Sequence, residues 1–132
     1  MSEHFNIEIV NPEKSFLSKE NVSEVVIPAF EGEIGILKDH IPIISFLKPG
    51  IIKVFTGTEG ENYYVEDGIV EFKDNSLSIL TSSIFNLKDI DKNHINNSIL
   101  EAEKELSKDE IDDQKRFLLN HKVEVLKSIS IN

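Results

Sequence analysis

Two glutamates and a histidine that lie near one another in the sequence are the side chains best suited to acid–base chemistry. Glu31 and Glu33 flank a glycine, and His40 follows shortly after them. A hydrolase needs paired titratable groups whose pKa values are held apart. A Glu-Gly-Glu segment is instead typical of an exposed turn, where a carboxylate is poorly placed for a pKa shift. Two interpretations are favoured over catalysis: a solvated turn beside a histidine that fills a loop, and a docking tip for a partner.

Other chemistry has no visible place in the sequence. The four histidines are scattered without the i, i+4 spacing of a helical metal site, and the chain contains no cysteine. Neither the G-x-x-x-x-G-K-S/T nor the G-x-G-x-x-G phosphate-binding motif occurs, and no nucleophile elbow is present. The sequence therefore predicts no catalytic residue, no metal and no cofactor.

A small group of basic residues near the C-terminus is a candidate anion-binding site. Lys115, Arg116 and Lys122 could bind an anion. The alternative is a solvated basic face that balances Asp112 and Asp113, and we favour it.

Composition narrows the class of protein. The 132 residues carry a formal net charge of −10, which repels phosphate backbones and argues against a nucleic-acid partner. No segment approaches the roughly 20 apolar residues of a membrane span. The opening MSEHFNIEIV lacks the basic and apolar regions of a secretory signal. We expect an acidic, soluble protein on the cytoplasmic side.

The stretch from Val26 to Val54 organises the chain. It contains three of the four prolines and three of the six glycines, and these residues separate short apolar runs. Such runs, bounded by Pro and Gly, are typical of buried strands joined by tight turns.

The pattern of strands extends over the first 85 or so residues. Phe5, Ile7 and Ile9 alternate with polar residues, residues 21–27 predict a strand that ends at Pro28, and residues 56–62 predict a polar hairpin loop. We expect about nine short strands in an antiparallel β-sandwich or barrel.

The C-terminal part has a helical period instead. Ile95, Ile99, Ala102 and Leu106 recur on one helical face, with Asp89 or Asp91 as a cap. Ser107 to Glu110 resembles a capping box, which predicts a second helix and hence an antiparallel helical hairpin. One continuous helix from about residue 91 to residue 127 is the alternative, since no Gly or Pro interrupts it. We expect two domains, residues 1–86 and 87–132.

The organising stretch also resembles a known family. Its EGEIGILKDHIPIISFLKPG segment is similar to the E-G-E-x-G, x-x-H-x-P and K-P-G pattern of the ε subunits of bacterial F-type ATP synthases. The matching positions, in register and without a gap, are Glu31, Gly32, Glu33, Gly35, Ile36, His40, Pro42, Leu47, Lys48, Pro49 and Gly50.

The resemblance implies a fold and a role. Members of this family have a ten-stranded β-sandwich followed by a helical hairpin. They are non-catalytic rotor subunits of the central stalk, bound to the γ subunit and the membrane c-ring on the cytoplasmic face of the bacterial inner membrane. They help to couple proton transport to ATP synthesis and can restrain ATP hydrolysis when the helices extend toward the catalytic α/β head. The c-ring loop of the family corresponds here to Glu31, Glu33 and His40.

A nucleotide motif of some members is degenerate in this chain. Ile90 and Asp91 match its start, but His94 and Ile95 replace the arginine and alanine that follow, which removes the guanidinium suited to phosphate. Two rivals to the rotor interpretation stay open. One is a free-standing regulator whose helices close over a nucleotide, against which the missing arginine counts. The other is a small hydrolase that uses Glu31, Glu33 and His40.

Overall fold

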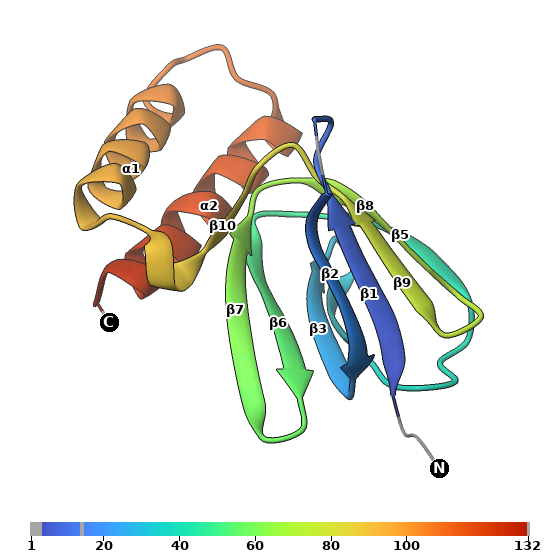
Figure 1. Cartoon of the computed structure of the whole chain (residues 1–132). Coiled ribbons are helices and arrows are strands. Elements are labelled where there is room, and N and C mark those ends of the chain that lie inside the picture. The colour runs from blue at the N-terminus through green and yellow to red at the C-terminus, as the bar shows by residue number, and fades with distance from the viewer. Residues whose placement is uncertain (1–3, 14, 132) are drawn as a thin grey trace. The chain divides into compact units, whose positions relative to one another are not determined.

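The computed structural model describes residues 4–13 and 15–131, and within them ten strands precede two helices (Figure 1). The strands are β1 (Phe5–Val10), β2 (Ser15–Val22), β3 (Glu24–Ala29), β4 (Gly32–Ile36), β5 (Ile43–Leu47), β6 (Gly50–Thr56), β7 (Glu59–Val65), β8 (Gly68–Lys73), β9 (Ser76–Leu80) and β10 (Ile84–Asn86). A 3₁₀ turn (Leu87–Asp89), α1 (Lys92–Leu106) and α2 (Asp113–Ile131) follow. The chain divides between Asn86 and Leu87 into two compact units.

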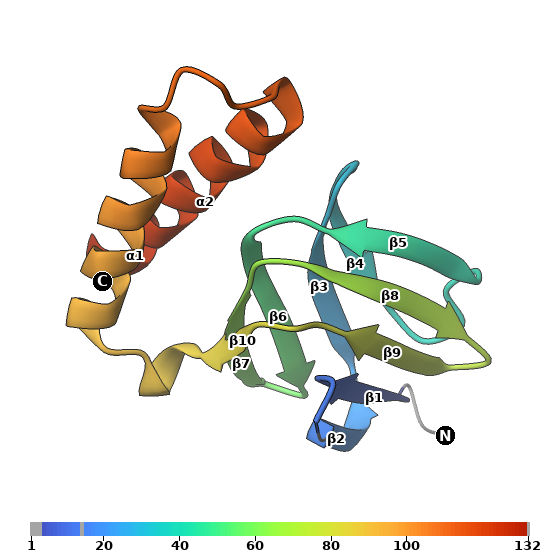
Figure 2. The ribbon, with the colours of Figure 1, turned by 90° about the horizontal axis from the view of Figure 1, so that it is seen from above.

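The sandwich unit is one continuous sheet that folds over on itself. Its strand order is β10-β7-β6-β3-β5-β8-β9-β1-β2, with β4 paired to the other edge of β3. The fold-over occurs at β3, which pairs with β6 through Glu24 to Val26 and with β5 only at Ala29. All pairs are antiparallel except β1 with β9. Figure 2 shows β5, β8 and β9 side by side as one layer of this unit.

The core lies between the two layers and is built by strand alternation. Every second residue of β1, β8 and β9 points inward, so that Phe5, Phe72 and Leu77 are buried while their neighbours are exposed. The rings of Phe5 and Phe72 meet edge to face, 5.5 Å apart. An ion pair joins Lys19 of β2 to Glu61 of β7. These contacts explain why alternating apolar residues here yield a closed sandwich.

One predicted strand end is wrong. β3 continues through Pro28 to Ala29, although the sequence predicted that it ends at the proline. The backbone nitrogen and the carbonyl oxygen of Pro28 point to the edge of β3 where its partner strand changes from β6 to β5. The carbonyl oxygen accepts a hydrogen bond from the backbone N–H of Lys48 at 3.0 Å. The missing proline N–H therefore falls in a gap between two ladders, where no partner requires it.

The predicted loop over residues 56–62 is also too long. β6 and β7 pair as far as Thr56 and Glu59, which leaves Gly57 and Thr58 as a two-residue turn. Gly57 has a φ of 66°, which such tight hairpin turns require and glycine adopts without steric cost.

The C-terminal unit is an antiparallel pair of helices rather than one continuous helix, and its starting points differ in part from the prediction. Asp91 caps α1, and its carboxylate accepts the N–H of Asn93 at 3.0 Å. Ser107 does not cap α2 as predicted; it ends α1, and its N–H donates to the carbonyl of Glu103. Asp112 takes the predicted role, since its carboxylate accepts the N–H of Lys115 at 2.7 Å.

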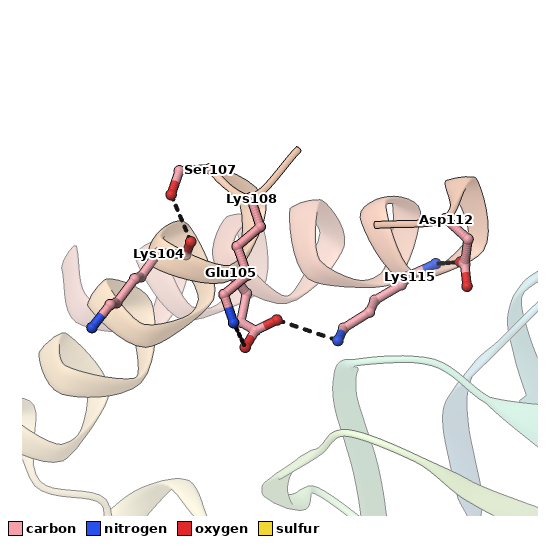
Figure 3. A network of polar contacts seen from close by, with 6 residues as sticks. All are labelled: Lys104, Glu105, Ser107, Lys108, Asp112 and Lys115. Carbon is pink, nitrogen blue, oxygen red and sulfur yellow. Dashed lines mark hydrogen bonds and ion pairs between the residues drawn. The ribbon is translucent and has the colours of Figure 1, made fainter. Parts of the chain in front are cut away.

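Apolar side chains and surface ion pairs hold this hairpin together. Ile95, Ile99 and Ala102 of α1 are buried, as the helical period predicts, and so are Val123 and Leu126 of α2. Near the connection the Glu105 carboxylate bonds Lys108 at 3.1 Å and Lys115 at 3.2 Å (Figure 3). Neither helix, over its described residues, is long and apolar enough to cross a membrane. The prediction of a β-sandwich followed by a helical hairpin is confirmed.

Candidate functional site

The two glutamates of the predicted docking tip lie at the turn between β3 and β4. Ala29 pairs with Gly32, so Phe30 and Glu31 form the turn. The Glu31 carboxylate accepts a hydrogen bond from the hydroxyl of Ser45 at 3.0 Å, which ties the turn to β5. Glu33 is exposed on β4. Both carboxylates face solvent and are available to a polar partner.

His40 lies in the loop of residues 37–42, beyond the other end of β4. Its backbone N–H donates to the backbone carbonyl of Leu37 at 3.1 Å, which closes a turn. Its Nδ1 lies 2.8 Å from the carbonyl oxygen of Ile41, so this nitrogen carries the proton. The ring packs edge-on against Phe72, 6.0 Å between centroids. His40 is therefore half-buried and held in place, as a loop-filling histidine would be.

The three residues occupy two positions and do not form a cluster. Glu31 and Glu33 lie at the first end of β4 and His40 follows its other end, and the five residues of the strand span about 13 Å at a rise of about 3.3 Å per residue. Within the described residues no group of three or more acidic, histidine or cysteine side chains could hold a metal ion. This separation leaves acid–base cooperation between the glutamates and His40 without a geometric basis.

An exposed apolar row crosses the outer face of the sandwich, and sequence reasoning missed it. Phe46 of β5 pairs with Ile69 of β8, which pairs with Leu80 of β9. These side chains are 58%, 44% and 48% exposed. On the same face, one register step away, Ile44 stands opposite Glu71. Three large apolar side chains in neighbouring strands form a continuous surface that a soluble protein seldom leaves open to water.

A shallow hollow adjoins this row. It is lined by Pro12, Phe46, Asp67, Gly68, Ile69, Leu80, Thr81 and Ser82. The Asp67 carboxylate accepts hydrogen bonds from the backbone N–H and the hydroxyl of Ser82, at 3.2 Å and 2.8 Å. The edge of the hollow is therefore rigid and polar, while its floor is apolar.

The predicted nucleotide and anion positions lie in the helical unit. The Asp91 carboxylate is occupied as the cap of α1, and Ile90 beside it is half-buried. Lys115 is paired with Glu105, and Arg116 reaches the carbonyl of Leu106 at 3.4 Å. These contacts are those of a helix terminus and a balanced surface, so nucleotide contact by Ile90 and Asp91 stays a prediction.

Comparison with known proteins places this geometry in a family. The family model described as "ATP synthase, Delta/Epsilon chain, beta-sandwich domain" matches residues 4–87. The ATP synthase epsilon chain of Pelagibacter ubique is 65% identical over 130 residues, which is 98% of this chain and all of that protein. That of Rhizobium etli (strain CIAT 652) is 34% identical over 92% of this chain and 89% of its own length.

Solved structures share the fold. A chain in the cryo-EM structure of the Euglena gracilis mitochondrial ATP synthase, "OSCP/F1/c-ring in rotational state 1", aligns with a TM-score of 0.77 at 21% identity. The alignment covers 99% of this chain and 82% of that chain. The β-sandwich fold, the family model over residues 4–87 and the 65% identity to a named relative over almost the whole chain lead to the same conclusion. This chain belongs to the ATP synthase epsilon chain family.

Proposed function

We propose that this chain is a non-catalytic rotor subunit in the central stalk of a proton-translocating ATP synthase, where it binds the γ subunit and the c-ring. In this role it helps to couple proton flow to ATP synthesis. It is peripheral to the membrane, reaching the cytoplasmic face through the complex. The family membership supports the complex, and one surface observation carries the binding role.

That observation is the exposed row of Phe46, Ile69 and Leu80. The centres of protein interfaces are apolar and their rims polar, and this row has an acidic residue, Glu71, on the adjoining register step. A partner that buries it would present an apolar centre with basic residues beside it. We assign this face to the γ subunit.

We assign the contact with the c-ring to Glu31, Glu33 and His40. A protein interface of standard size buries about 800 Å² on each side and is therefore about 30 Å across. Both positions, about 13 Å apart along β4, fit within one such interface. Exposed carboxylates suit polar loops, since hydrogen bonds at a wet interface do not require burial.

The helical unit is assigned to regulation. Its two helices are joined by few buried side chains and by surface ion pairs, which contribute little each. An element held this weakly can change partners at low cost, which is what restraining ATP hydrolysis from the catalytic head requires.

The test is the affinity of the full chain for its γ subunit, measured for the unchanged chain and for Ile69→Asp. Ile69 is at the middle of the row and exposed, so the substitution leaves the core intact. A carboxylate buried at the centre of an interface should weaken binding at least about thirtyfold, as central interface residues do.

Leu100→Asp is the matched control. Leu100 is another exposed apolar side chain, 64% accessible, but it lies on α1. It should bind γ like the unchanged chain. If the unchanged chain does not bind γ, the rotor assignment fails; if Ile69→Asp binds as tightly as the control, the γ subunit does not use this face.

A further inference from the structure

Asn75, at the turn between β8 and β9, joins three segments that are far apart in the sequence. Its backbone carbonyl accepts the backbone N–H of Asn6, in β1, at 3.1 Å. Its side-chain oxygen accepts the N–H of Asp39 at 2.7 Å, and its amide nitrogen donates to the Asp39 carboxylate at 2.9 Å. Because a backbone N–H can only donate, these two bonds fix the orientation of the amide.

Both partners hold unusual backbone conformations. Asp39 and Asn75 have φ values of 65° and 57°, and Asp74 has a φ of 51°. Only short polar residues such as Asn and Asp adopt this left-handed region readily without being glycine. The reciprocal pair therefore joins two turns that each need a residue of this kind, and other side chains would strain the turns.

The loop that the pair holds presents side chains to the outside. Leu37 and Ile41 are 56% and 72% exposed, on either side of the half-buried His40. The loop has no ladder partner of its own, since β4 ends at Ile36 and β5 begins at Ile43. Its position relative to the sandwich consequently depends on side-chain contacts, which include the two bonds to Asn75 at 2.7 Å and 2.9 Å.

We infer that Asn75 and Asp39 are positioning residues for the docking loop of residues 37–42, and that they set its affinity for the rotor by ordering the loop before binding. This inference rests on the proposed function, because the partner is the c-ring with its γ subunit. A loop that is already ordered does not lose conformational entropy again when the partner binds.

The test compares binding of full-length chains to a purified subcomplex of γ and the c-ring. Asn75→Asp places a second carboxylate against that of Asp39, which now lies 2.9 Å from the amide nitrogen. Repulsion should release the loop while Asp keeps the left-handed turn accessible. Ordering several freed residues on binding should lower the affinity at least about tenfold.

The exchanged double variant Asp39→Asn with Asn75→Asp provides the rescue. It restores one amide and one carboxylate, so an amide N–H and the backbone N–H of position 39 can again donate to a carboxylate. Its affinity should return to within about twofold of the unchanged chain, clearly short of the expected loss of about tenfold. Asn62→Asp on β7 adds the same charge at an exposed site and is the control.

Hydrogen exchange at the amide of position 39 separates positioning from a general loss of structure. It should speed up in Asn75→Asp and recover in the double variant, while the thermal midpoint changes little. If Asn75→Asp fails to fold, Asp39→Gly is used instead, since glycine keeps the positive φ and removes the carboxylate acceptor.

Two results would overturn the inference alone: unchanged affinity in Asn75→Asp despite faster exchange, or weak binding in the double variant despite restored protection. Failure of the unchanged chain to bind the subcomplex would overturn the proposed function, and this inference with it.

Discussion

At the scale of single residues, the Lys-Pro-Gly turn before β6 has a steric reason. A Cβ added at Gly50 would lie 2.5 Å from the Cβ and 2.9 Å from the Cγ of Pro28. Pro28 has a rigid ring and lies in the strand where the sheet folds over. Glycine at position 50 therefore lets β6 begin directly beside the ring of Pro28, where a residue with a Cβ would overlap it.

We predict that Gly50→Ala destabilises the protein by about 1–3 kcal/mol, as overpacked sites do. The new methyl group meets a ring that cannot rotate away, so the backbone of β6 or β3 must shift. The free energy of unfolding, measured by urea denaturation with a constant slope, checks the prediction.

Gly35→Ala is the control for that substitution. An added Cβ at Gly35 would have only a Glu24 carboxylate oxygen, at 3.4 Å, as its nearest contact. That side chain can move, so the change should lie within about 0.5 kcal/mol. Equal losses for the two glycine variants would show that contact with Pro28 is not the cause.

At the scale of elements, the sequence predicts what depends on local pattern and misses what depends on partners. The alternation in β1 and the period of α1 both gave buried faces as expected. The predicted strand end at Pro28 is wrong because the local sequence does not show that β3 changes its partner strand there. The prediction that Ser107 caps the second helix is wrong because a serine can end one helix as well as begin the next.

The candidate site was incompletely predicted for the same reason. Phe46, Ile69 and Leu80 come together only through cross-strand register. The apolar runs between Val26 and Val54 are typical of buried strands, yet in β5 Ser45 points inward and Phe46 outward. Asn75 bonds Asp39 in a loop 36 positions away, and nothing in the neighbouring sequence indicates this contact. Local pattern carries no information about such contacts.

Within the hairpin, we predict that Glu105 titrates below an ordinary glutamate. Hydrogen bonds from Lys108 first and Lys115 second lower the pKa of its carboxyl group (Figure 3). A lowered pKa means that the stabilisation is present above the unfolded pKa of about 4.3 and is lost as the pH falls through the folded value. Lys108→Met and Lys115→Met should each raise the pKa, with the larger rise for Lys108.

Carboxyl chemical shifts followed by NMR against pH check this. Lys104→Met removes a cation next to Glu105 in sequence and should move the pKa less than either of the other two variants. Added salt should shrink all three differences, because the pairs are exposed and screened. A Glu105 pKa unchanged by Lys108→Met and Lys115→Met would mean that these bonds do not form in solution.

At the scale of the whole molecule, the two compact units differ in how they are stabilised. The buried apolar cluster of the sandwich draws on residues from Phe5 to Ile84, all before the division at Asn86. The helices are of 15 and 19 residues, and most of the stability of a protein helix comes from the packing of its apolar face. Cooperative folding should therefore belong to the sandwich.

We predict that a chain ending at Asn86 folds cooperatively and binds γ with an affinity reduced less than about tenfold, because the core and the Phe46–Ile69–Leu80 row are retained. Circular dichroism during urea unfolding and γ affinity are the measurements. Ile69→Asp in the shortened chain should abolish the remaining binding, which controls for contacts outside the row. If the shortened chain still unfolds cooperatively but no longer binds γ, the main γ contact lies on the helices. The assignment of γ binding to the sandwich face would then be wrong.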